Sequence, residues 1–401
     1  MSSLQDIVII GGGQAAGWAA KTLRDLGYDQ RLRVVADETH DFYERPPLSK
    51  DILSGTLAPG QLSLFPAELL ASLAIDWQRP RRALAIDRQQ RQVMLDNGIA
   101  LAYDRLLIAT GSRPRLPDPA WAHIAGVLTL RSVDDALALR QRLASCQRLA
   151  VIGGGWIGLE VASLARGQGI DVVIYERGPY LCGRSIGNDV STHLAALHRE
   201  REIALRLDCG DLRLAQVPTG VQITTPADAA VYDTVLVGAG AQLNTELAQA
   251  AGLQLGHGIV VDGSGRTSDP AIYAAGDVAQ HPRHGLCVQS WANAQNQGIA
   301  SARGMLGLDV NYDDIPWLWS DQHGINIQIL GLHSEHNRRV HRAAEDGRDI
   351  YFQLDQQARL QHMVAFGDAR AIKLGRRWMS AARQLDPAVL ADPGIDLMAL
   401  R

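Results

Sequence analysis

Short runs of apolar residues recur through most of the chain and alternate with stretches of helical periodicity. Residues 7–10, 32–35, 106–109, 149–152, 172–175 and 234–237 consist almost entirely of Ile, Val, Leu and Ala. Such runs are typical of parallel strands whose sheet is covered on both faces, because neither face then meets water. Helices between successive runs would complete β-α-β units. The pattern predicts an α/β fold with parallel sheets.

Two other patterns interrupt this alternation. Residues 92–98 predict a hairpin arm ending in an Asn97-Gly98 turn, with a strand that returns through residues 102–106. Beyond residue 315, short alternating runs predict antiparallel strands at residues 325–330, 338–342, 350–354 and 361–366. A helix is predicted at residues 372–385. We therefore expect a separate C-terminal α+β domain.

A glycine-rich turn follows the run at residues 149–152. Gly153, Gly155 and Gly158 have the spacing in which the first glycine allows a tight turn, the second admits a pyrophosphate and the third lets helix and strand pack closely. Glu176 ends the next apolar run, where an acidic side chain accepts hydrogen bonds from a ribose 2′-hydroxyl. This segment predicts a dinucleotide site.

The same arrangement occurs near the N-terminus. Gly11 and Gly13 follow residues 7–10, and Ala16 stands at the third position, where alanine is an accepted variant. Asp37 ends the next run and is a second candidate ribose contact; the alternative is an ordinary solvated acid. Two such motifs in one chain predict two bound dinucleotides and two Rossmann-like domains related as an internal repeat.

A loop at residues 42–50 carries two prolines bracketed by Arg45 and Lys50. A stiff backbone with fixed cations suits a site that contains phosphates and an electron-rich ring. The alternative is a surface turn that begins a helix at Ser49. Later, Asp277 ends another apolar run at the edge where open α/β sheets bind ligands, and we expect it to contact a polyol hydroxyl.

Composition narrows the functional classes. The formal charge of -4 over 401 residues argues against a nucleic-acid partner bound by overall field. No run approaches the length that spans a bilayer, and the first strand begins too early for a signal peptide, so we expect no membrane association and a cytoplasmic location. The four cysteines, Cys146, Cys182, Cys209 and Cys287, form no close pair, and we expect reduced thiols.

Seven ordered segments give the chain a family resemblance. They are residues 11–16, 43–50, 103–111, 153–160, 273–278, 290–297 and 319–322. The chain resembles the flavoprotein ferredoxin reductases of bacterial aromatic-ring dioxygenase and cytochrome P450 systems. This group also resembles apoptosis-inducing factor and, more distantly, glutathione reductase. The resemblance covers the whole length.

The resemblance implies two glutathione reductase-like domains and the C-terminal domain. FAD would bind residues 1–113 with 242–314, NAD(H) would bind residues 114–241, and residues 315–401 would form the third domain. The implied FAD contacts are Gly11, Gly13, Gln14, Ala15, Ala16, Asp37, Arg45, Lys50, Ala109, Thr110, Gly111, Gly276, Asp277 and Trp291. The implied NAD contacts are Gly153, Gly155, Trp156, Ile157, Gly158, Glu160, Glu176 and Gly240. No metal site is implied.

In relatives, the positions matching Lys50 and Glu160 form an ion pair beside the isoalloxazine. The position matching Trp319 lies at the flavin–nicotinamide pocket. These three residues are the predicted catalytic group. The chain departs from many relatives at Gln289, where they carry glutamate. Arg177, next to Glu176, could meet a 2′-phosphate, but the acid at position 176 favours NADH.

The implied activity is NADH:ferredoxin oxidoreductase. Hydride passes from NADH to FAD, and single electrons then pass to a [2Fe-2S] ferredoxin, either Rieske-type or of the plant or putidaredoxin type. Alternatives are a rubredoxin or putidaredoxin reductase of an alkane or P450 system, and a non-enzymatic redox sensor like apoptosis-inducing factor. A disulfide reductase would need a cysteine pair after the FAD loop, and the peroxidase and oxidase branch a cysteine near Phe42; neither is present.

An acidic ferredoxin would need exposed cations on this chain. Candidates for such a docking rim are Arg338, Arg339, Arg342, Lys373, Arg376 and Arg377. Complementary charge would mainly raise the association rate. The alternative is a solvated face with no partner.

Overall fold

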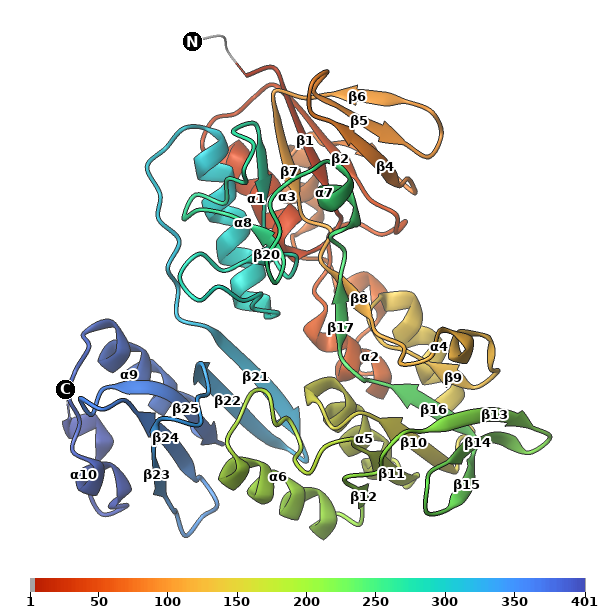
Figure 1. Cartoon of the computed structure of the whole chain (residues 1–401), viewed down its shortest axis with the longest axis vertical. Coiled ribbons are helices and arrows are strands. Elements are labelled where there is room, and N and C mark those ends of the chain that lie inside the picture. The colour runs from red at the N-terminus through yellow and green to blue at the C-terminus, as the bar shows by residue number, and fades with distance from the viewer. Residues whose placement is uncertain (1–3, 401) are drawn as a thin grey trace. The chain divides into compact units, whose positions relative to one another are not determined.

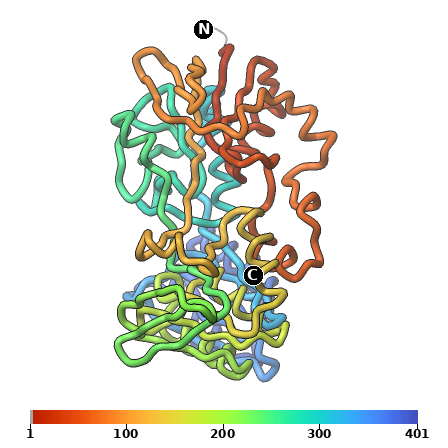
Figure 2. The backbone as a smooth tube through the Cα atoms, turned by 90° about the vertical axis from the view of Figure 1, so that its right-hand side faces the viewer, coloured from red at the N-terminus to blue at the C-terminus, as the bar shows by residue number. Residues whose placement is uncertain are grey.

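The computed structural model describes residues 4–400 and groups the chain into two compact units. The first unit comprises residues 1–45, 59–113 and 241–314, and the second comprises residues 46–58, 114–240 and 315–401. Figure 2 follows the chain by colour, from red at the N-terminus to blue in the C-terminal part, which belongs to the second unit. The finer division into three domains stays a prediction.

A five-stranded parallel sheet forms the centre of the first unit. Its order is β19-β7-β1-β2-β3, with β1 (Asp6–Ile10), β2 (Arg31–Val35), β3 (Asp76–Gln78), β7 (Arg105–Ile108) and β19 (Ile272–Ala274). In β1, Ile7 and Ile9 face one core and Val8 and Ile10 face the other. Because successive side chains of a strand alternate between faces, one short apolar run supplies both cores.

Helices cover one face of this sheet and a small antiparallel sheet covers the other (Figure 1). The helices are α1 (Gln14–Asp25) and α8 (Trp291–Met305), which pack on each other. The antiparallel sheet contains β4 (Ala83–Asp87), β5 (Gln92–Leu95) and β6 (Ala100–Ala102). The predicted hairpin at Asn97-Gly98 is confirmed. The predicted return strand is wrong in extent, because β6 ends at Ala102 and β7 joins the parallel sheet.

The second unit contains its own parallel sheet. Its order is β12-β11-β10-β16-β9, with β9 (Val127–Leu128), β10 (Arg148–Ile152), β11 (Asp171–Tyr175), β12 (Ala204–Arg206) and β16 (Thr234–Val237). Its helices are α4 (Val133–Leu143), α5 (Trp156–Gly167) and α6 (Asn188–Glu200), and β13 (Arg213–Val217), β14 (Gly220–Thr224) and β15 (Ala229–Tyr232) form an antiparallel sheet. The predicted parallel strands of both units are confirmed.

An antiparallel sheet and two helices complete the second unit. The strand order is β21-β22-β25-β24-β23, with β21 (Trp317–Gln322), β22 (Ile325–Gly331), β23 (Arg338–Arg342), β24 (Ile350–Leu354) and β25 (Leu360–Phe366). The helices are α9 (Ala369–Ser380) and α10 (Pro387–Ala391). Four strands were predicted; β21 was not, because Ser320 and Gln322 are buried polar residues at core positions.

Helix α9 begins and ends earlier than the pattern predicts. Asp368 caps its start by accepting hydrogen bonds from the backbone N–H groups of Arg370 and Ala371. Its end lies at Ser380, and Ala382 beyond it has a φ of 47°. The predicted range of residues 372–385 is therefore shifted toward the C-terminus.

The remaining elements are short. They are α2 (Asp51–Ser54), α3 (Ala67–Ser72), α7 (Glu246–Ala250), the 3-10 turns Pro46–Ser49, Pro59–Gln61, Pro119–His123 and Leu397–Ala399, and the pairs β8 (Ser112–Pro114) with β17 (Ala241–Leu243) and β18 (Ile259–Val260) with β20 (Ala279–Gln280). Across residues 4–400, no helix combines the length and the apolar character needed to cross a bilayer.

Candidate functional site

The first glycine turn leaves room for a ligand at one position only. Gly11 has a φ of 129°, and a Cβ there would lie 2.1 Å from the carbonyl oxygen of Ala109, so the turn requires glycine. At Gly13 a Cβ would meet only a guanidinium nitrogen of Arg45, at 4.0 Å. Within residues 4–400, no side chain caps α1 at Gly13. Open space in front of uncapped backbone N–H groups fits a pyrophosphate.

Arg45 is fixed beside this turn. Its Nη2 lies 2.8 Å from Oε1 of Glu38, and its Nη1 donates to the hydroxyl of Tyr43 at 2.9 Å. Burial disfavours the Arg45 charge, but Tyr43, Glu38 and Asp277 outweigh burial and raise the arginine pKa. Arg45 is thus a permanent cation at the predicted FAD site. Sequence reasoning missed Glu38, which stands next to the predicted Asp37.

Asp37 lies at the surface just beyond β2. Its Oδ2 is 3.4 Å from Nη2 of Arg82, and both side chains are more than half exposed. An exposed carboxylate at the end of the second strand is available to a ribose, and the assignment of Asp37 stays a prediction.

Asp277 is buried where β19 ends and accepts a hydrogen bond from Ser112 at 2.8 Å. The neighbouring Gly276 donates its backbone N–H to Oε1 of Gln297 at 2.9 Å. The amide nitrogen of Gln297 is buried and has no hydrogen-bond partner among the described residues. A buried donor without an acceptor fits a bound polar ligand.

Other predicted FAD residues lie around the same strand ends. Thr110 and Asn244 exchange two hydrogen bonds of 2.8 Å, which fixes the turn after β7 that contains Ala109 and Gly111. With its amide oriented to satisfy its neighbours, Gln14 lies 3.1 Å from the indole nitrogen of Trp291. This joins the starts of α1 and α8. Ala15 and Ala16 are buried on α1.

The glycine turn of the second unit repeats this division between tight and open positions. A Cβ at Gly153 would lie 2.4 Å from the carbonyl oxygen of Gly238, and a Cβ at Gly158 would lie 2.6 Å from that of Gly153. At Gly155 the first contact is at 4.0 Å, and within the described residues no side chain caps α5 there. The arrangement fits a second pyrophosphate.

Glu176 is fixed at the end of β11. Its two carboxylate oxygens accept hydrogen bonds from the backbone N–H groups of Gly154, at 2.7 Å, and Gly178, at 2.8 Å. The acid therefore points at the glycine turn, while Arg177 is exposed. The rest of the predicted NAD set surrounds the same turn: Trp156 has a buried indole N–H without a partner among the described residues, Ile157 is exposed, and Gly240 has a φ of 98°.

The structure brings Lys50 and Glu160 together inside the second unit. Nζ of Lys50 lies 2.9 Å from Oε1 of Glu160, whose side chain is only 5% exposed. Lys50 precedes α2 and Glu160 lies on α5. The backbone carbonyl of Pro46 lies 3.4 Å from the same ammonium. The predicted ion pair is present.

Three further donors surround the Glu160 carboxylate. Ser320 donates its hydroxyl to Oε1 at 2.7 Å, the backbone N–H of Asp321 approaches the same oxygen at 3.3 Å, and Ser49 donates to Oε2. A buried carboxylate needs such donors, because its charge has lost its water. Sequence reasoning missed Ser49, Ser320 and Asp321, although all three lie in segments that carried the resemblance.

Trp319 lies on the same unit as this pair. Its ring is 6.0 Å from Nζ of Lys50, and it stacks on Trp317 with ring centroids 5.2 Å apart. Trp317 in turn donates its indole N–H to Gln328 at 2.8 Å. The three predicted catalytic residues, Lys50, Glu160 and Trp319, therefore meet at one place.

Among the candidate docking cations, Arg342 has a structural role. It donates hydrogen bonds to backbone carbonyls around the end of α10, namely those of Leu390, Asp392, Pro393 and Ile395. Arg339 pairs with Glu335. Lys373 and Arg377 are exposed on α9, and the Arg376 guanidinium lies 6.0 Å from the ring of Trp317. Arg338 is also exposed, on β23, so the exposed cations of the predicted rim lie on α9 and at this position.

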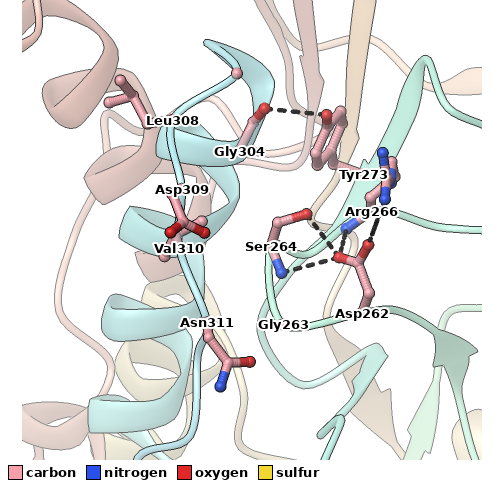
Figure 3. A pocket seen from close by; sticks show the side chains of 11 residues that line it. Asp262, Gly263, Ser264, Arg266, Tyr273, Gly304, Leu308, Asp309, Val310 and Asn311 are labelled. Atoms are coloured by element: carbon pink, nitrogen blue, oxygen red, sulfur yellow. Dashed lines mark hydrogen bonds and ion pairs between the residues drawn. The ribbon is translucent and has the colours of Figure 1, made fainter.

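A surface hollow of the first unit is separate from these groups (Figure 3). Its polar groups bond one another: Asp262 accepts hydrogen bonds from Ser264 and Arg266, and Tyr273 donates to the carbonyl of Gly304 at 3.1 Å. These groups bond one another without a ligand, and we assign none.

All four cysteines are free thiols in the described part of the chain. Burial raises the thiol pKa in each, well above the ordinary value for Cys182 and to about 12 for Cys287. Since the thiolate is the reactive form, these side chains are poor redox nucleophiles. This agrees with the expectation of reduced thiols and gives the site no thiol chemistry.

Comparison with known proteins defines the class. The family described as pyridine nucleotide-disulphide oxidoreductase matches residues 5–298, and the family described as reductase C-terminal matches residues 317–401. The chain belongs to the pyridine nucleotide-disulphide oxidoreductase family and carries the reductase C-terminal domain. It is an FAD- and NAD(P)H-binding oxidoreductase, as the two glycine motifs predict.

Individual relatives define the branch of the family. The chain is 36% identical to the ferredoxin–NAD(+) reductase component of the anthranilate 1,2-dioxygenase system of Burkholderia cepacia, over 98% of this chain and 99% of the relative. It is 35% identical to the corresponding component of the p-cumate 2,3-dioxygenase system of Pseudomonas putida, over 98% of both. The resemblance stated from the sequence is confirmed.

Solved structures of ferredoxin reductases also resemble this chain over almost its whole length. A ferredoxin reductase for the CYP199A2 system from Rhodopseudomonas palustris superposes with a TM-score of 0.92 at 33% identity, over 99% of this chain and 100% of that one. The covalent complex of putidaredoxin reductase with putidaredoxin gives a TM-score of 0.92 at 31% identity, over 99% and 98%. The predicted fold class is confirmed.

Proposed function

We propose that the chain is an NADH:ferredoxin reductase that passes electrons to a [2Fe-2S] ferredoxin of an aromatic-ring dioxygenase system. The observation that carries the proposal is the buried Lys50–Glu160 pair, held on the same unit as the second glycine motif and Trp319. A buried ion pair is costly to assemble because both charged groups lose water. Charged groups in such surroundings cluster at functional sites, so we assign this pair the role of setting the electric field around the bound cofactor rings. The relatives named above are reductases of this kind.

FAD supplies the chemistry that accepts a hydride from NADH and releases electrons one at a time. The chain's own residues bind and orient. Gly13 and Arg45 receive the phosphates in the first unit, and Gly155 does so in the second. Lys50, Glu160 and Trp319 fix the polar surroundings of the reacting rings and exclude water. No side chain acts as a nucleophile, in keeping with the raised thiol pKa of every cysteine.

Glu176 supports NADH as the coenzyme. Its carboxylate is held by two backbone N–H groups at the end of β11, so it cannot swing away from an incoming 2′-phosphate. A fixed negative charge at this position repels a phosphate and accepts from a hydroxyl. Arg177 lies beside it but is exposed, which makes it the weaker determinant.

For the partner we propose an acidic ferredoxin that docks on α9. Lys373 and Arg377 are exposed there, and Arg376 lies against Trp317 in the strand that also contains Trp319. A ferredoxin of the putidaredoxin type is the second candidate, because the putidaredoxin reductase complex superposes over almost the whole chain. The cytoplasm, where NADH and such carriers are available, is the location that this function requires.

Anaerobic stopped-flow spectroscopy of the purified holoenzyme tests the proposal. Mixing with NADH should bleach the flavin rapidly, mixing with NADPH should bleach it slowly, and adding an oxidised [2Fe-2S] ferredoxin should restore the flavin absorbance. Flavin that is reduced by NADH but returns its electrons only to oxygen or a quinone would leave the family assignment intact and refute the ferredoxin partner.

A further inference from the structure

The hydrogen bonds around Glu160 continue beyond Ser320. The hydroxyl oxygen of Ser320 lies 2.9 Å from Nε2 of Gln322, and Oε1 of Gln322 lies 2.8 Å from Nε2 of His198. Nδ1 of His198 lies 3.2 Å from Nε2 of His323. We call these five residues the Glu160 hydrogen-bond network. It joins α5, β21, the turn after β21 and α6, all in the second unit.

The carboxylate end of the network fixes the direction of every hydrogen bond. Glu160 is paired with Lys50 and only accepts, so Ser320 must donate its single proton to it. The Ser320 oxygen then accepts from the amide nitrogen of Gln322, which leaves the Gln322 oxygen to accept from His198. All donors therefore point toward Glu160.

The same logic assigns the histidine tautomer. His198 must carry its proton on Nε2 to donate to Gln322, so its Nδ1 is left to accept from His323. Burial lowers the pKa of His198 to about 4, which keeps the ring neutral at pH 7. Burial, with His198 and then Arg201, lowers the pKa of His323 to about 4 as well.

The network is shielded from water where it meets Glu160. Ser320 and His198 are 0% exposed and Gln322 is 1% exposed. Hydrogen bonds in such surroundings are stronger than in water and polarise one another, so a remote member can change the charge distribution at the last acceptor. His323 is anchored at the outer end, where its backbone N–H donates to Ser163 at 2.7 Å.

We propose that Gln322 and His198 are positioning residues for the reductase reaction, because they force Ser320 to donate to Glu160 and so hold the carboxylate against Lys50. Without the amide of Gln322, the Ser320 hydroxyl is free to rotate away, and Glu160 loses one of its four donors. The expected effect on flavin reduction rests on the proposed function, whereas the orientation of the hydrogen bonds is independent of that function.

Variants at position 322 separate the possibilities. Gln322→Leu removes the amide donor. Gln322→Glu keeps the shape but offers a second carboxylate, so Ser320 can no longer be a donor to Glu160 alone. Both should slow flavin reduction by NADH in single turnover by about tenfold, the size expected for the loss of one hydrogen bond to a charged group. The KM for NADH should stay within about twofold, since the lost interaction affects the transition state rather than coenzyme binding.

The matched control is Gln353→Leu. Gln353 is also a buried glutamine of the C-terminal sheet, accepts from the backbone of Ser334 at 3.1 Å and lies 2.7 Å from Nδ1 of His333, but it is not a member of the Glu160 network. It should lower stability without changing the rate of flavin reduction. An equal loss of rate in Gln353→Leu and Gln322→Leu would overturn the proposal.

Two variants of His198 add a rescue test. His198→Leu removes the donor to Gln322, whereas His198→Gln keeps an N–H that can reach it. The glutamine variant should recover most of the rate that the leucine variant loses. Equal rates in the two variants would contradict the positioning role.

Nitrogen-15 NMR of the histidine-labelled holoenzyme tests the orientation without turnover. His198 should be neutral, with its proton on Nε2, and Gln322→Leu should shift it toward a mixture of tautomers. A proton on Nδ1 in the unsubstituted protein would refute the direction derived above. If NADH fails to reduce the flavin at all, the proposed function falls, while the NMR result still decides the inference.

Discussion

Lys50 and Glu160 stand far apart in the sequence, yet Nζ of the lysine lies 2.9 Å from Oε1 of the glutamate. The two side chains are 18% and 5% exposed, so water solvates neither charge well, and each charge is compensated by the other. The pair joins the segment at residues 46–58, which contains α2, to helix α5. Loss of the ion pair should lower both the free energy of unfolding and the rate of flavin reduction.

Lys50→Met should destabilise the protein by about 3 kcal/mol, because removing one partner leaves a buried charge uncompensated. Denaturant unfolding, followed by circular dichroism, measures this. Lys373→Met, at an exposed position of α9, is the control and should change the free energy of unfolding by less than about 0.5 kcal/mol. Similar values for the two variants would show that Glu160 does not depend on the lysine.

Gly11→Ala should abolish stable FAD binding or folding, because the new Cβ would lie 2.1 Å from a backbone carbonyl oxygen at a φ of 129°. The flavin-to-protein absorbance ratio of the purified protein is the measurement. Gly60→Ala is the control, since its Cβ would meet nothing within 4 Å. Full flavin content in Gly11→Ala would mean that the turn can relax far more than the structure indicates.

Glu176→Ser should reduce the preference for NADH over NADPH by at least about tenfold, equivalent to 1.4 kcal/mol. The repulsion of a 2′-phosphate disappears, while a hydroxyl remains to bond to the sugar. The ratio of kcat/KM for the two coenzymes reports the change. Arg177→Gln should leave the NADH value unaltered. An unchanged ratio in Glu176→Ser would mean that another residue determines the preference for NADH.

Reversing the charge of Arg376 and Arg377 should slow ferredoxin reduction at low salt and leave ferricyanide reduction by NADH intact. Long-range attraction raises the association rate and is screened by salt, so the difference should shrink as ionic strength rises. Arg213→Glu, at an exposed position of β13, serves as the control for net charge. If both activities fall equally, α9 is not a docking surface.

Stability should fall as the pH is lowered from 6.5 toward 4. Burial lowers the pKa of His198 to about 4 and that of His362 to about 3, so both stay neutral in the folded protein while the unfolded chain takes up protons below pH 6.5. Above pH 6.5 neither histidine lowers the free energy of unfolding. By pH 5, protonation of the unfolded chain at each of the two positions lowers the free energy of unfolding by about 2 kcal/mol. His362→Gln should flatten the dependence of unfolding free energy on pH. An unchanged slope would mean that His362 is protonated in the folded state.

Much of the architecture could be predicted because burial leaves a signature in the sequence. The run at residues 149–152 is apolar since both faces of β10 are covered, and Gly153 and Gly158 are glycines because no Cβ fits there. Strand β21 carried no such signature. Its polar residues Ser320 and Gln322 are buried because partners from α5 and α6 satisfy them.

The candidate site could be predicted only where a motif is local. The glycine turns are contiguous segments, so spacing alone reveals them. The donors around Glu160 come from two segments, residues 49–50 and residues 320–321, and nothing in the sequence near Ser49 or Ser320 indicates that both reach one carboxylate. Resemblance supplied the Lys50–Glu160 pair, but hydrogen bonds that depend on side-chain rotamers become visible only in three dimensions.

Each of the two units is assembled from three separate stretches of chain, and the chain passes between them after residues 45, 58, 113, 240 and 314. The sheet of the first unit begins with β1 but includes β19, at Ile272–Ala274. On the ribosome, this sheet therefore cannot be completed until all five strands of the second unit's parallel sheet have been synthesised. Neither unit can be produced as a simple truncation, and dissecting the protein would require rejoining stretches that the gene keeps apart.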